Sequence, residues 1–384
     1  MDFSLTDEQS LLLESIDEFC DLYFTEDAVR KMYEMHSMPD EIVRAYRDAG
    51  FGLLGIPEEY GGIPTDNLTI GLILERLYHR AGCVNILYQN HLSMFNIMRF
   101  GTEEQKARCM EHYMETGWPI ASLSISEPVT GSDNRAMKCT ARRQPDGTYL
   151  LRGQKTWVTM GGALPYTIVI AKDEDPAREN EAMSLWLVDM QSAGVSTSAL
   201  RKIGQQVIPF YEVFFDDVVL TEDMRMGEPG EGFHMLMKNF EVERLYCVAV
   251  VLGLAQAALE DAAEYATKRV AFGEPIANRQ MIQEKLTEME TLVQSTRFMM
   301  YHTFWMLDHG MDVRLESAMC KRHGCLACSQ VADMALSVYG ALGYTDEVRV
   351  GRIWSDIRGN QFAGGTPEIM AYIVGRQVAK KYSR

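Results

Sequence analysis

The sequence of 384 residues lacks the signatures of several large enzyme classes. No G-x-G-x-x-G follows a strand-like run and opens a helix, and no G-x-x-x-x-G-K-[ST] occurs, so any dinucleotide must be held in another way. The eight histidines form no H-E-x-x-H or other compact ligand pair, and no G-x-S-x-G elbow is present. We therefore predict no metal site and no serine-hydrolase chemistry.

Positive charge is scarce and long apolar runs are absent. Lys and Arg number 37 against 54 Asp and Glu, a formal net charge of −17 that disfavours binding to nucleic acid or an anionic membrane. The most apolar stretches, such as residues 245–259, are interrupted before the roughly 20 apolar residues of a membrane span. The first residues show no basic leader followed by an apolar run. We expect a cytoplasmic protein that binds neither nucleic acid nor membrane.

The eight cysteines are scattered among apolar neighbours, which indicates reduced and partly buried thiols rather than a disulfide framework. Cys320, Cys325 and Cys328 match the C-x4-C-x2-C spacing of plant-type iron–sulfur proteins. No later cysteine is available as a fourth ligand, and the run is typical of one helix on which positions 320 and 325 face differently. We therefore favour a structural role for these thiols.

The hydrophobic pattern divides the chain into three parts, and it predicts an α+β fold that is mainly helical. Residues 1–116 show helical spacing of apolar side chains. Residues 117–230 contain short apolar runs separated by turn signals, which indicates a small β domain. The helical period returns over residues 231–384, with helices expected at 233–268, 278–309, 313–342 and 367–381.

Two segments in or near the β domain could hold a flat or anionic ligand. Residues 123–133 (LSISEPVTGSD) combine a strand-like start with a Pro/Gly turn, which can leave backbone N–H groups free for a polar ring or phosphate. In residues 153–162 (GQKTWVTMGG), Trp157 and Thr159 are two apart and hence on one face of a strand. An indole and a hydroxyl there could stack on and bond to a heteroaromatic ring. Taken singly, an ordinary turn and a core tryptophan explain both segments.

In this order, the two segments resemble the two flavin-binding signatures of the acyl-CoA dehydrogenase family. Further stretches along the whole chain are similar to family landmarks: residues 5–9 (LTDEQ), 57–62 (PEEYGG), 101–106 (GTEEQK), 215–218 (FDDV), 227–233, 269–273 (RVAFG) and 365–369 (GTPEI). The resemblance implies an N-terminal helical domain, a middle β domain and a C-terminal four-helix bundle. It also implies a homotetramer that binds FAD at a subunit interface.

The resemblance assigns cofactor contacts residue by residue. One group would line the flavin of its own subunit: Leu123, Ser124, Ile125, Ser126, Ser132, Trp157, Val158 and Thr159. A second group would reach the cofactor of a neighbouring subunit, with the planar guanidinium of Arg269 suited to its pyrophosphate: Arg269, Phe272, Arg279 and Gln280. Five further positions match cofactor contacts at the end of the chain: Ser337, Gly340, Ala341, Thr366 and Glu368.

The catalytic base requires separate treatment, because many family members carry a glutamate immediately before the Gly-Thr pair and this chain has Gly364 there. A second subset places the glutamate on the first helix of the bundle, and Glu243 occupies that position. Removal of the α-proton of a thioester needs a nearby carboxylate with a pKa raised by burial. Glu241 is the nearest rival, but it lies roughly 200° around the helix from Glu243. An ordinary pairing of Glu243 with Arg244 is the alternative to a catalytic role.

The resemblance further places five residues near the thioester ligand: Ser132, Glu241, Arg244, Gly364 and Gly365. It implies an acyl-CoA or enoyl-CoA substrate and an electron-transfer flavoprotein as partner. Similarity to short-chain and crotonobetainyl-CoA reductase-type members makes physiological reduction a further hypothesis.

Two departures from the family pattern leave other functions open. Residues 337–341 (SVYGA) replace a flavin-proximal Gln-x-x-Gly-Gly, and residues 128–132 (PVTGS) replace Pro-Gly-Ala-Gly-Ser. A flavin-binding or acyl-CoA-binding protein without dehydrogenase activity is one alternative. A helical scaffold with no cofactor is another.

Overall fold

The N-terminal part of the computed structural model is helical, as its apolar spacing predicts. The structure describes residues 4–174 and 182–383, without the side chains of 89–91. Thr6 and Thr102 each begin a helix with a reciprocal capping box, closed by Gln9 and Gln105. The helices are α1 (Asp7–Tyr23), α2 (Glu26–Met35), α3 (Asp40–Asp48), α4 (Asn67–Ala81), α5 (Leu87–Phe100) and α6 (Glu103–Thr116), with short 3-10 turns at Phe51–Leu53 and Glu58–Tyr60.

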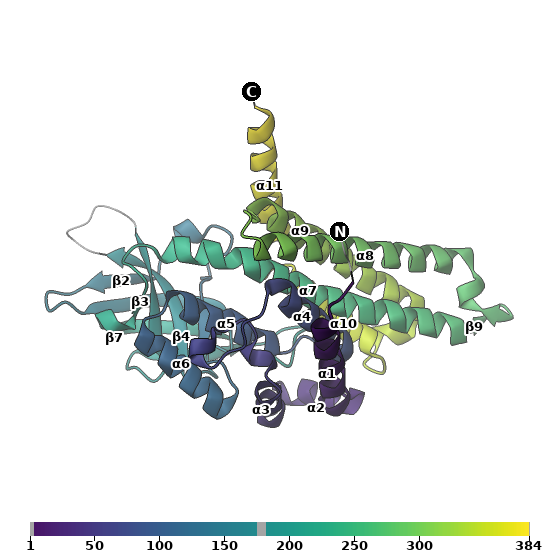
Figure 1. Cartoon of the computed structure of the whole chain (residues 1–384), viewed down its shortest axis with the longest axis horizontal. Helices are drawn as coiled ribbons and strands as arrows, with labels where there is room; N and C mark the ends of the chain where they lie inside the picture. Colours follow the sequence, from purple (N-terminus) through teal and green to yellow (C-terminus); the bar gives the residue numbers. More distant parts are fainter. Residues whose placement is uncertain (1–3, 175–181, 384) are drawn as a thin grey trace.

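The middle part is an eight-stranded sheet that lies at one end of the molecule (Figure 1). Its order is β6-β7-β3-β2-β4-β5-β8, and β1 pairs with β4 in parallel. The strands are β1 (Ala121–Ser124), β2 (Thr140–Arg143), β3 (Tyr149–Thr159), β4 (Tyr166–Glu174), β5 (Met183–Asp189), β6 (Val195–Leu200), β7 (Phe210–Leu220) and β8 (Arg225–Met226). The runs at 149, 166 and 212 from which strands were predicted lie in β3, β4 and β7.

The C-terminal part is helical again, which confirms the predicted fold class. Helix α9 (Arg314–Tyr339) packs against α7 (Gly232–Lys268), α8 (Gln280–Asp308), α10 (Arg349–Asn360) and α11 (Pro367–Tyr382). Figure 1 shows α11 projecting from the body of the molecule. A hairpin of β9 (Val270–Ala271) and β10 (Glu274–Pro275) joins α7 to α8. Helix α10 and this hairpin were not expected from the sequence.

The β domain is attached to the helices by the loop that follows β6. Gln205 donates from its backbone N–H to the Asp356 carboxylate and from Nε2 to the Asp356 carbonyl oxygen at 3.1 Å. Its Nε2 also lies 3.3 Å from Oδ1 of Asn360. Val207 and Ile208 belong to the same apolar core as α7 and α9. Met160, directly after β3, donates its N–H to the carbonyl oxygen of Pro209 in the same loop at 2.9 Å. The loop therefore brings the end of β3 close to the end of α10.

Two helices are long and apolar enough to cross a membrane by length and composition alone. The apolar window of α7 is 83% buried within the protein, as expected of a core helix, and that of the segment Arg314–Tyr344 is 39% buried. All eight cysteines are buried and free. Cys320, Cys325 and Cys328 all lie on α9, as predicted. Within the described ranges, no three His, Cys, Asp or Glu side chains are grouped to hold a metal ion.

Candidate active site

Glu243 lies in the N-terminal half of α7 and has an unusual environment for a glutamate. Its side chain is half-buried, and Oε2 is enclosed without a hydrogen-bond partner in the part of the chain that the structure describes. Burial raises the pKa of Glu243 to about 7, although the charges of Arg244 and Lys321 act in the opposite direction. A carboxylate with such a pKa can accept a proton near neutral pH.

Glu241 has a different environment, which separates the two candidate bases. Its Oε1 lies 3.6 Å from the Arg314 guanidinium at the start of α9. Arg244 follows Glu243 and is buried, and its Nε has no hydrogen-bond partner among the described residues. Burial lowers the pKa of Arg244, and Glu241 and Glu243 oppose that effect. The free carboxylate is therefore Glu243, and Glu241 has an ion-pair partner.

The turn after α10 approaches the same part of α7. Gly364 and Gly365 have φ of +63° and +101°, a backbone conformation that favours glycine. A Cβ placed on Gly364 would lie 3.5 Å from Sγ of Cys247, 3.6 Å from Cε of Lys321 and 3.9 Å from Cγ of Arg244. Cys247 is one helical turn after Glu243 and shares its face of α7. A side chain at 364 would thus project toward the helix face that carries Glu243.

The two flavin-signature segments are hydrogen-bonded to each other in the β domain. Thr156 donates its N–H to the carbonyl oxygen of Ser126 at 2.9 Å. Leu123 and Ile125 pack in one apolar cluster with Phe240 of α7, one turn before Glu243. The segments therefore lie next to the helix that carries the candidate base.

Side chains of these segments point in different directions. The β3–β7 register shifts between Lys155 and Val158, and Trp157 has φ of +59° and is 60% exposed. Val158 is buried and Thr159 half-buried, so the bulge turns the indole out of the sheet. Ser124 is fully buried and its hydroxyl lies 2.7 Å from that of Thr167, inside the domain. Ser132 is exposed, just after the Glu127–Thr130 turn.

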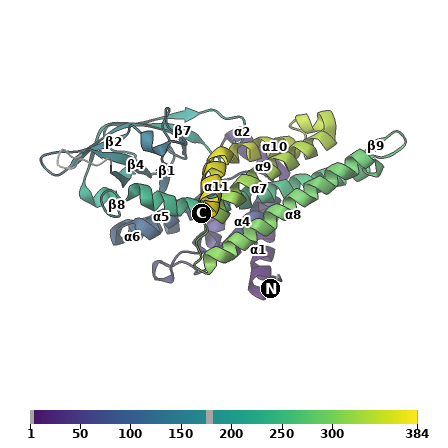
Figure 2. The same cartoon turned by 90° about the horizontal axis from the view of Figure 1, so that it is seen from above.

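The second group of predicted cofactor residues lies at the other end of the molecule. Arg279 pairs with Glu274 at 3.1 Å and stacks over the Phe272 ring at 5.7 Å from its centroid. Its Nε is without a hydrogen-bond partner in the described part of the chain, Phe272 is exposed, and Gln280 begins α8. Arg269 follows directly after the 37 residues of α7, which span about 55 Å. Figures 1 and 2 both show the β9 hairpin far from the large sheet.

The remaining predicted residues are divided between these regions. Ser337, Gly340 and Ala341 are exposed at the end of α9. Tyr339 beside them stacks on Tyr265 at 4.2 Å, one turn before Arg269, so these three positions lie toward the hairpin end. Thr366 caps α11 by accepting the N–H of Ile369 at 3.3 Å, and Glu368 is exposed in the first turn of that helix.

Two residues of the site were missed from the sequence. Lys321 of α9 is 1% exposed, and Asn360 is the last residue of α10. Nζ of Lys321 donates to the Asn360 carbonyl oxygen at 2.6 Å. A helical lysine is ordinarily solvated, so only its position on the buried face of α9, between Ser317 and Gly324, could have pointed to it.

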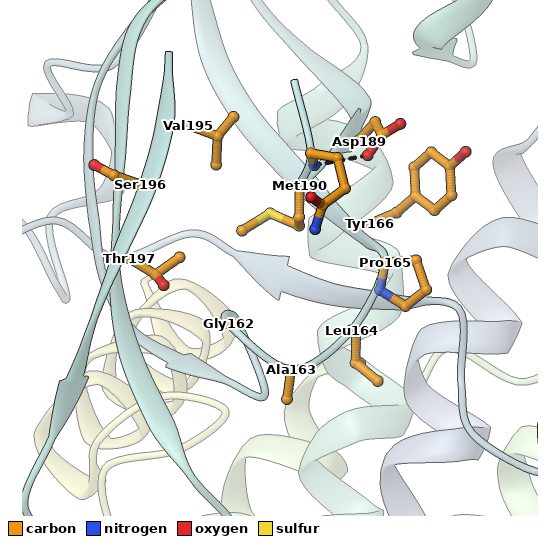
Figure 3. A pocket seen from close by; sticks show the side chains of 11 residues that line it. Gly162, Ala163, Leu164, Pro165, Tyr166, Asp189, Met190, Val195, Ser196 and Thr197 are labelled. Atoms are coloured by element: carbon orange, nitrogen blue, oxygen red, sulfur yellow. Dashed lines mark hydrogen bonds between the residues drawn. The ribbon is translucent and has the colours of Figure 1, made fainter. Parts of the chain in front are cut away.

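A hollow in the β domain contains none of the predicted site residues. It has a volume of about 560 Å³ and is lined by residues 162–166, 189–191 and 195–197. Figure 3 shows Tyr166 and Met190 on its wall, with Asp189 accepting the backbone N–H of Gln191 at 2.8 Å. The carboxylate that lines it, Asp189, is engaged in this backbone hydrogen bond, so the hollow offers less for proton transfer than the surroundings of Glu243.

The three-part fold agrees with comparisons to known proteins. The N-terminal, middle and C-terminal domains of acyl-CoA dehydrogenases match residues 6–116, 122–218 and 230–379. The chain belongs to the acyl-CoA dehydrogenase family and is an oxidoreductase of that class. It is 41% identical to the probable acyl-CoA dehydrogenase YdiO of Escherichia coli K12 over 382 residues, covering 100% of this chain and 99% of the relative.

Solved structures show the same similarity. An acyl-CoA dehydrogenase from Slackia heliotrinireducens is 32% identical with a TM-score of 0.89, covering 100% of this chain and 99% of that one. Butyryl-CoA dehydrogenase from Megasphaera elsdenii is 28% identical with a TM-score of 0.90, covering 99% and 100%. These likenesses extend over the complete three-part architecture.

Proposed function

We propose that this protein interconverts a small acyl-CoA and its α,β-enoyl-CoA with FAD, and that Glu243 transfers the α-proton. The observation that carries the proposal is the enclosed, unbonded Oε2 of Glu243, beside the turn that contains Gly364. The carboxylate accepts the α-proton in oxidation and returns it in reduction. When bound, FAD supplies the hydride acceptor or donor for the β-carbon. Similarity to butyryl-CoA dehydrogenase supports a short acyl chain.

The residues on this chain fit a flavin dinucleotide. The exposed indole of Trp157 and the hydroxyl of Thr159 offer a stacking surface and a hydrogen bond to a flat ring. Arg269 and Arg279 offer guanidinium groups for a pyrophosphate, and Nε of Arg279 is free to donate within the described structure. The two sets are separated by the length of α7. This separation supports a shared site in which Arg269, Phe272, Arg279 and Gln280 hold the cofactor of a neighbouring subunit in a homotetramer.

Charge that develops on the thioester oxygen needs fixed hydrogen-bond donors. Gly364 retains its backbone N–H although it has no side chain, so the family's donor position remains available. The buried guanidinium of Arg244 adds positive charge close by. An electron-transfer flavoprotein is the proposed electron partner, and reduction of an enoyl-CoA is the proposed alternative direction.

Glu243→Gln tests this function, because the amide keeps the shape of the side chain but cannot accept the proton. We expect bound FAD to remain while its bleaching by an acyl-CoA slows by about 10² to 10⁴. In the wild type, bleaching should speed up as the pH rises through about 7, because the ionised carboxylate is the reactive form. Stopped-flow absorbance with a panel of acyl-CoA thioesters measures both effects.

Glu104→Gln is the matched control, since the same change in α6 removes only an exposed ion pair with Arg108. Near-wild-type bleaching by Glu243→Gln would place the proton acceptor elsewhere. Yellow wild-type protein that no thioester bleaches would indicate a binding protein. Protein that stays colourless with added FAD would leave only the scaffold.

A further inference from the structure

Lys321 is a buried cation that has no carboxylate partner among the residues that the structure describes. Its side chain lies inside the helical bundle, where Nζ donates to the Asn360 carbonyl oxygen at 2.6 Å and to Sγ of Cys325 at 2.9 Å. Among the residues that the structure describes, no carboxylate oxygen lies within 4.0 Å of Nζ. A buried ammonium group is costly unless something compensates it. The location therefore calls for an explanation beyond packing.

Lys321 and the candidate base Glu243 lie on two helices, α9 and α7, that pack against each other. Cε of Lys321 lies 3.6 Å from the point that a Cβ on Gly364 would occupy, and Sγ of Cys247 lies 3.5 Å from the same point. Cys247 follows Glu243 by one turn on α7, which packs closely against α9. Lys321 thus lies next to the Gly364 turn, where α9 faces α7.

Lys321 is held in its charged form. Burial lowers the pKa of Lys321, but the hydrogen bond to Cys325 and the charge of Glu243 oppose this effect, and the pKa stays above its ordinary value. The short bond to Asn360 is consistent with a charged donor. This bond also fixes the end of α10, four residues before Gly364.

Four ionisable groups act on Glu243 or are acted on by it: Tyr88 of α5, Arg244 and Cys247 of α7, and Lys321 of α9. Burial raises the pKa of Cys247 to about 12 and that of Tyr88 well above its ordinary value, so both are neutral near pH 7. Only Arg244 and Lys321 are charged there. Arg244 has the larger effect on Glu243 but also interacts with Glu241, whereas among the described residues the hydrogen-bond partners of Lys321 include no carboxylate.

We propose that Lys321 is a positioning residue whose buried ammonium group keeps the Glu243 carboxylate ionised in its apolar surroundings and anchors the Gly364 turn through Asn360. The inference rests on the proposed role of Glu243 as base. Burial by itself favours the protonated form of Glu243, which cannot accept the α-proton. Lys321 keeps the carboxylate available at neutral pH without forming the direct ion pair that would occupy its oxygens.

Lys321→Met tests the charge, because methionine is similar in length and uncharged. Infrared titration of the purified protein follows the protonated carboxyl band, and subtraction of Glu243→Gln spectra assigns the band to Glu243. We expect its midpoint to rise by about one pH unit or more when the cation is removed. The pH midpoint of flavin bleaching should rise by the same amount. Lys321→Arg should keep both midpoints near the wild-type value.

Cys325→Ser is the structural control, because it changes the neighbour of Nζ but leaves the charge in place. Its midpoints should match the wild type. Folded Lys321→Met with an unmoved carboxyl midpoint would overturn the proposal. If Lys321→Met fails to fold, Lys321→Gln is measured in its place. If neither variant folds, the charge serves folding only, and this result also overturns the proposal.

The two proposals fail separately in this experiment. If no thioester bleaches the wild-type flavin but the infrared midpoint moves in Lys321→Met, the dehydrogenase function is wrong and the electrostatic link stands. If bleaching depends on Glu243 but neither midpoint moves, the function stands and the role of Lys321 is wrong.

Discussion

Lys155 and Lys321 are both completely enclosed lysines, and they differ in what surrounds the ammonium group. Nζ of Lys155 in β3 lies 2.9 Å from Oε1 of Glu127 and 3.0 Å from the Ile125 carbonyl oxygen. Glu127 also accepts the backbone N–H of Cys139 at 3.0 Å. Charge and hydrogen bonds are satisfied within this group, which joins the two flavin-signature segments.

Within the described part of the chain, the hydrogen-bond acceptors of Lys321 are neutral, and the glutamate that its charge affects keeps an unbonded oxygen. A buried carboxylate with all its bonds made has little tendency to take a proton. One held near a cation but not bonded to it can react. The comparison therefore distinguishes a structural lysine–glutamate pair from one arranged for proton transfer.

The largest expected effect on stability comes from breaking the satisfied pair. Glu127→Gln would leave the Lys155 charge buried and unpaired, and we expect a loss of about 3 to 5 kcal/mol in the free energy of unfolding. Glu243→Gln is the matched change in the other region and should cost far less, because it removes a charge that has no hydrogen bond at Oε2. Urea unfolding of both variants at pH 8 measures the difference. Equal losses would remove the distinction between the two regions.

The second test moves the base while keeping Lys321 in place. Glu243→Gly alone should slow flavin bleaching by about 10² to 10⁴, and adding Gly364→Glu should recover about tenfold or more. The recovery stays incomplete because a glutamate at φ of +63° is strained. Glu243→Gly with Gly364→Gln is the control, as it has the same size without a proton acceptor. Equal rates for the two double variants would mean that position 364 does not reach the α-proton.

The third test concerns Arg269, an exposed cation for which the described residues provide no ion-pair partner. Arg269→Ala should change the free energy of unfolding by less than about 0.5 kcal/mol, as usual for surface positions. It should weaken FAD retention by about tenfold, since the guanidinium is proposed to meet the pyrophosphate of a neighbouring subunit. Dialysis followed by the flavin-to-protein absorbance ratio measures retention, and Lys268→Ala is the adjacent control. A monomer that holds FAD stoichiometrically would contradict the shared site.

Much of the fold followed from local pattern. Helix α7 was expected at 233–268 and is observed at Gly232–Lys268, because apolar residues recur at helical spacing along its length. Helix α10 was missed, since Gly351 and Gly359 and its polar residues weaken the helical signal. It is held by contacts remote in sequence, including the bonds of Gln205 to Asp356 and Asn360. Such tertiary stabilisation is invisible to a local pattern.

Less of the candidate site than of the fold could be predicted from the sequence. The position of Glu243 came from family resemblance and the rotation of Glu241 from helix geometry, but neither could reveal the unbonded Oε2. The bulge at Trp157 was also hidden, because its positive φ arises from the register of β3 on β7. Lys321 was overlooked because burial of a lysine depends on how α7, α9 and the Gly364 turn pack together.

The burial of all eight thiols gives the protein a built-in reporter of conformational opening. A water-soluble alkylating reagent reacts with accessible thiolate, and burial both hides these sulfur atoms and, at Cys247, raises the pKa to about 12. Labelling therefore occurs only through transiently opened molecules. Because the cysteines are distributed from α1 to α9, mass spectrometry of labelled peptides can map which part of the chain opens first.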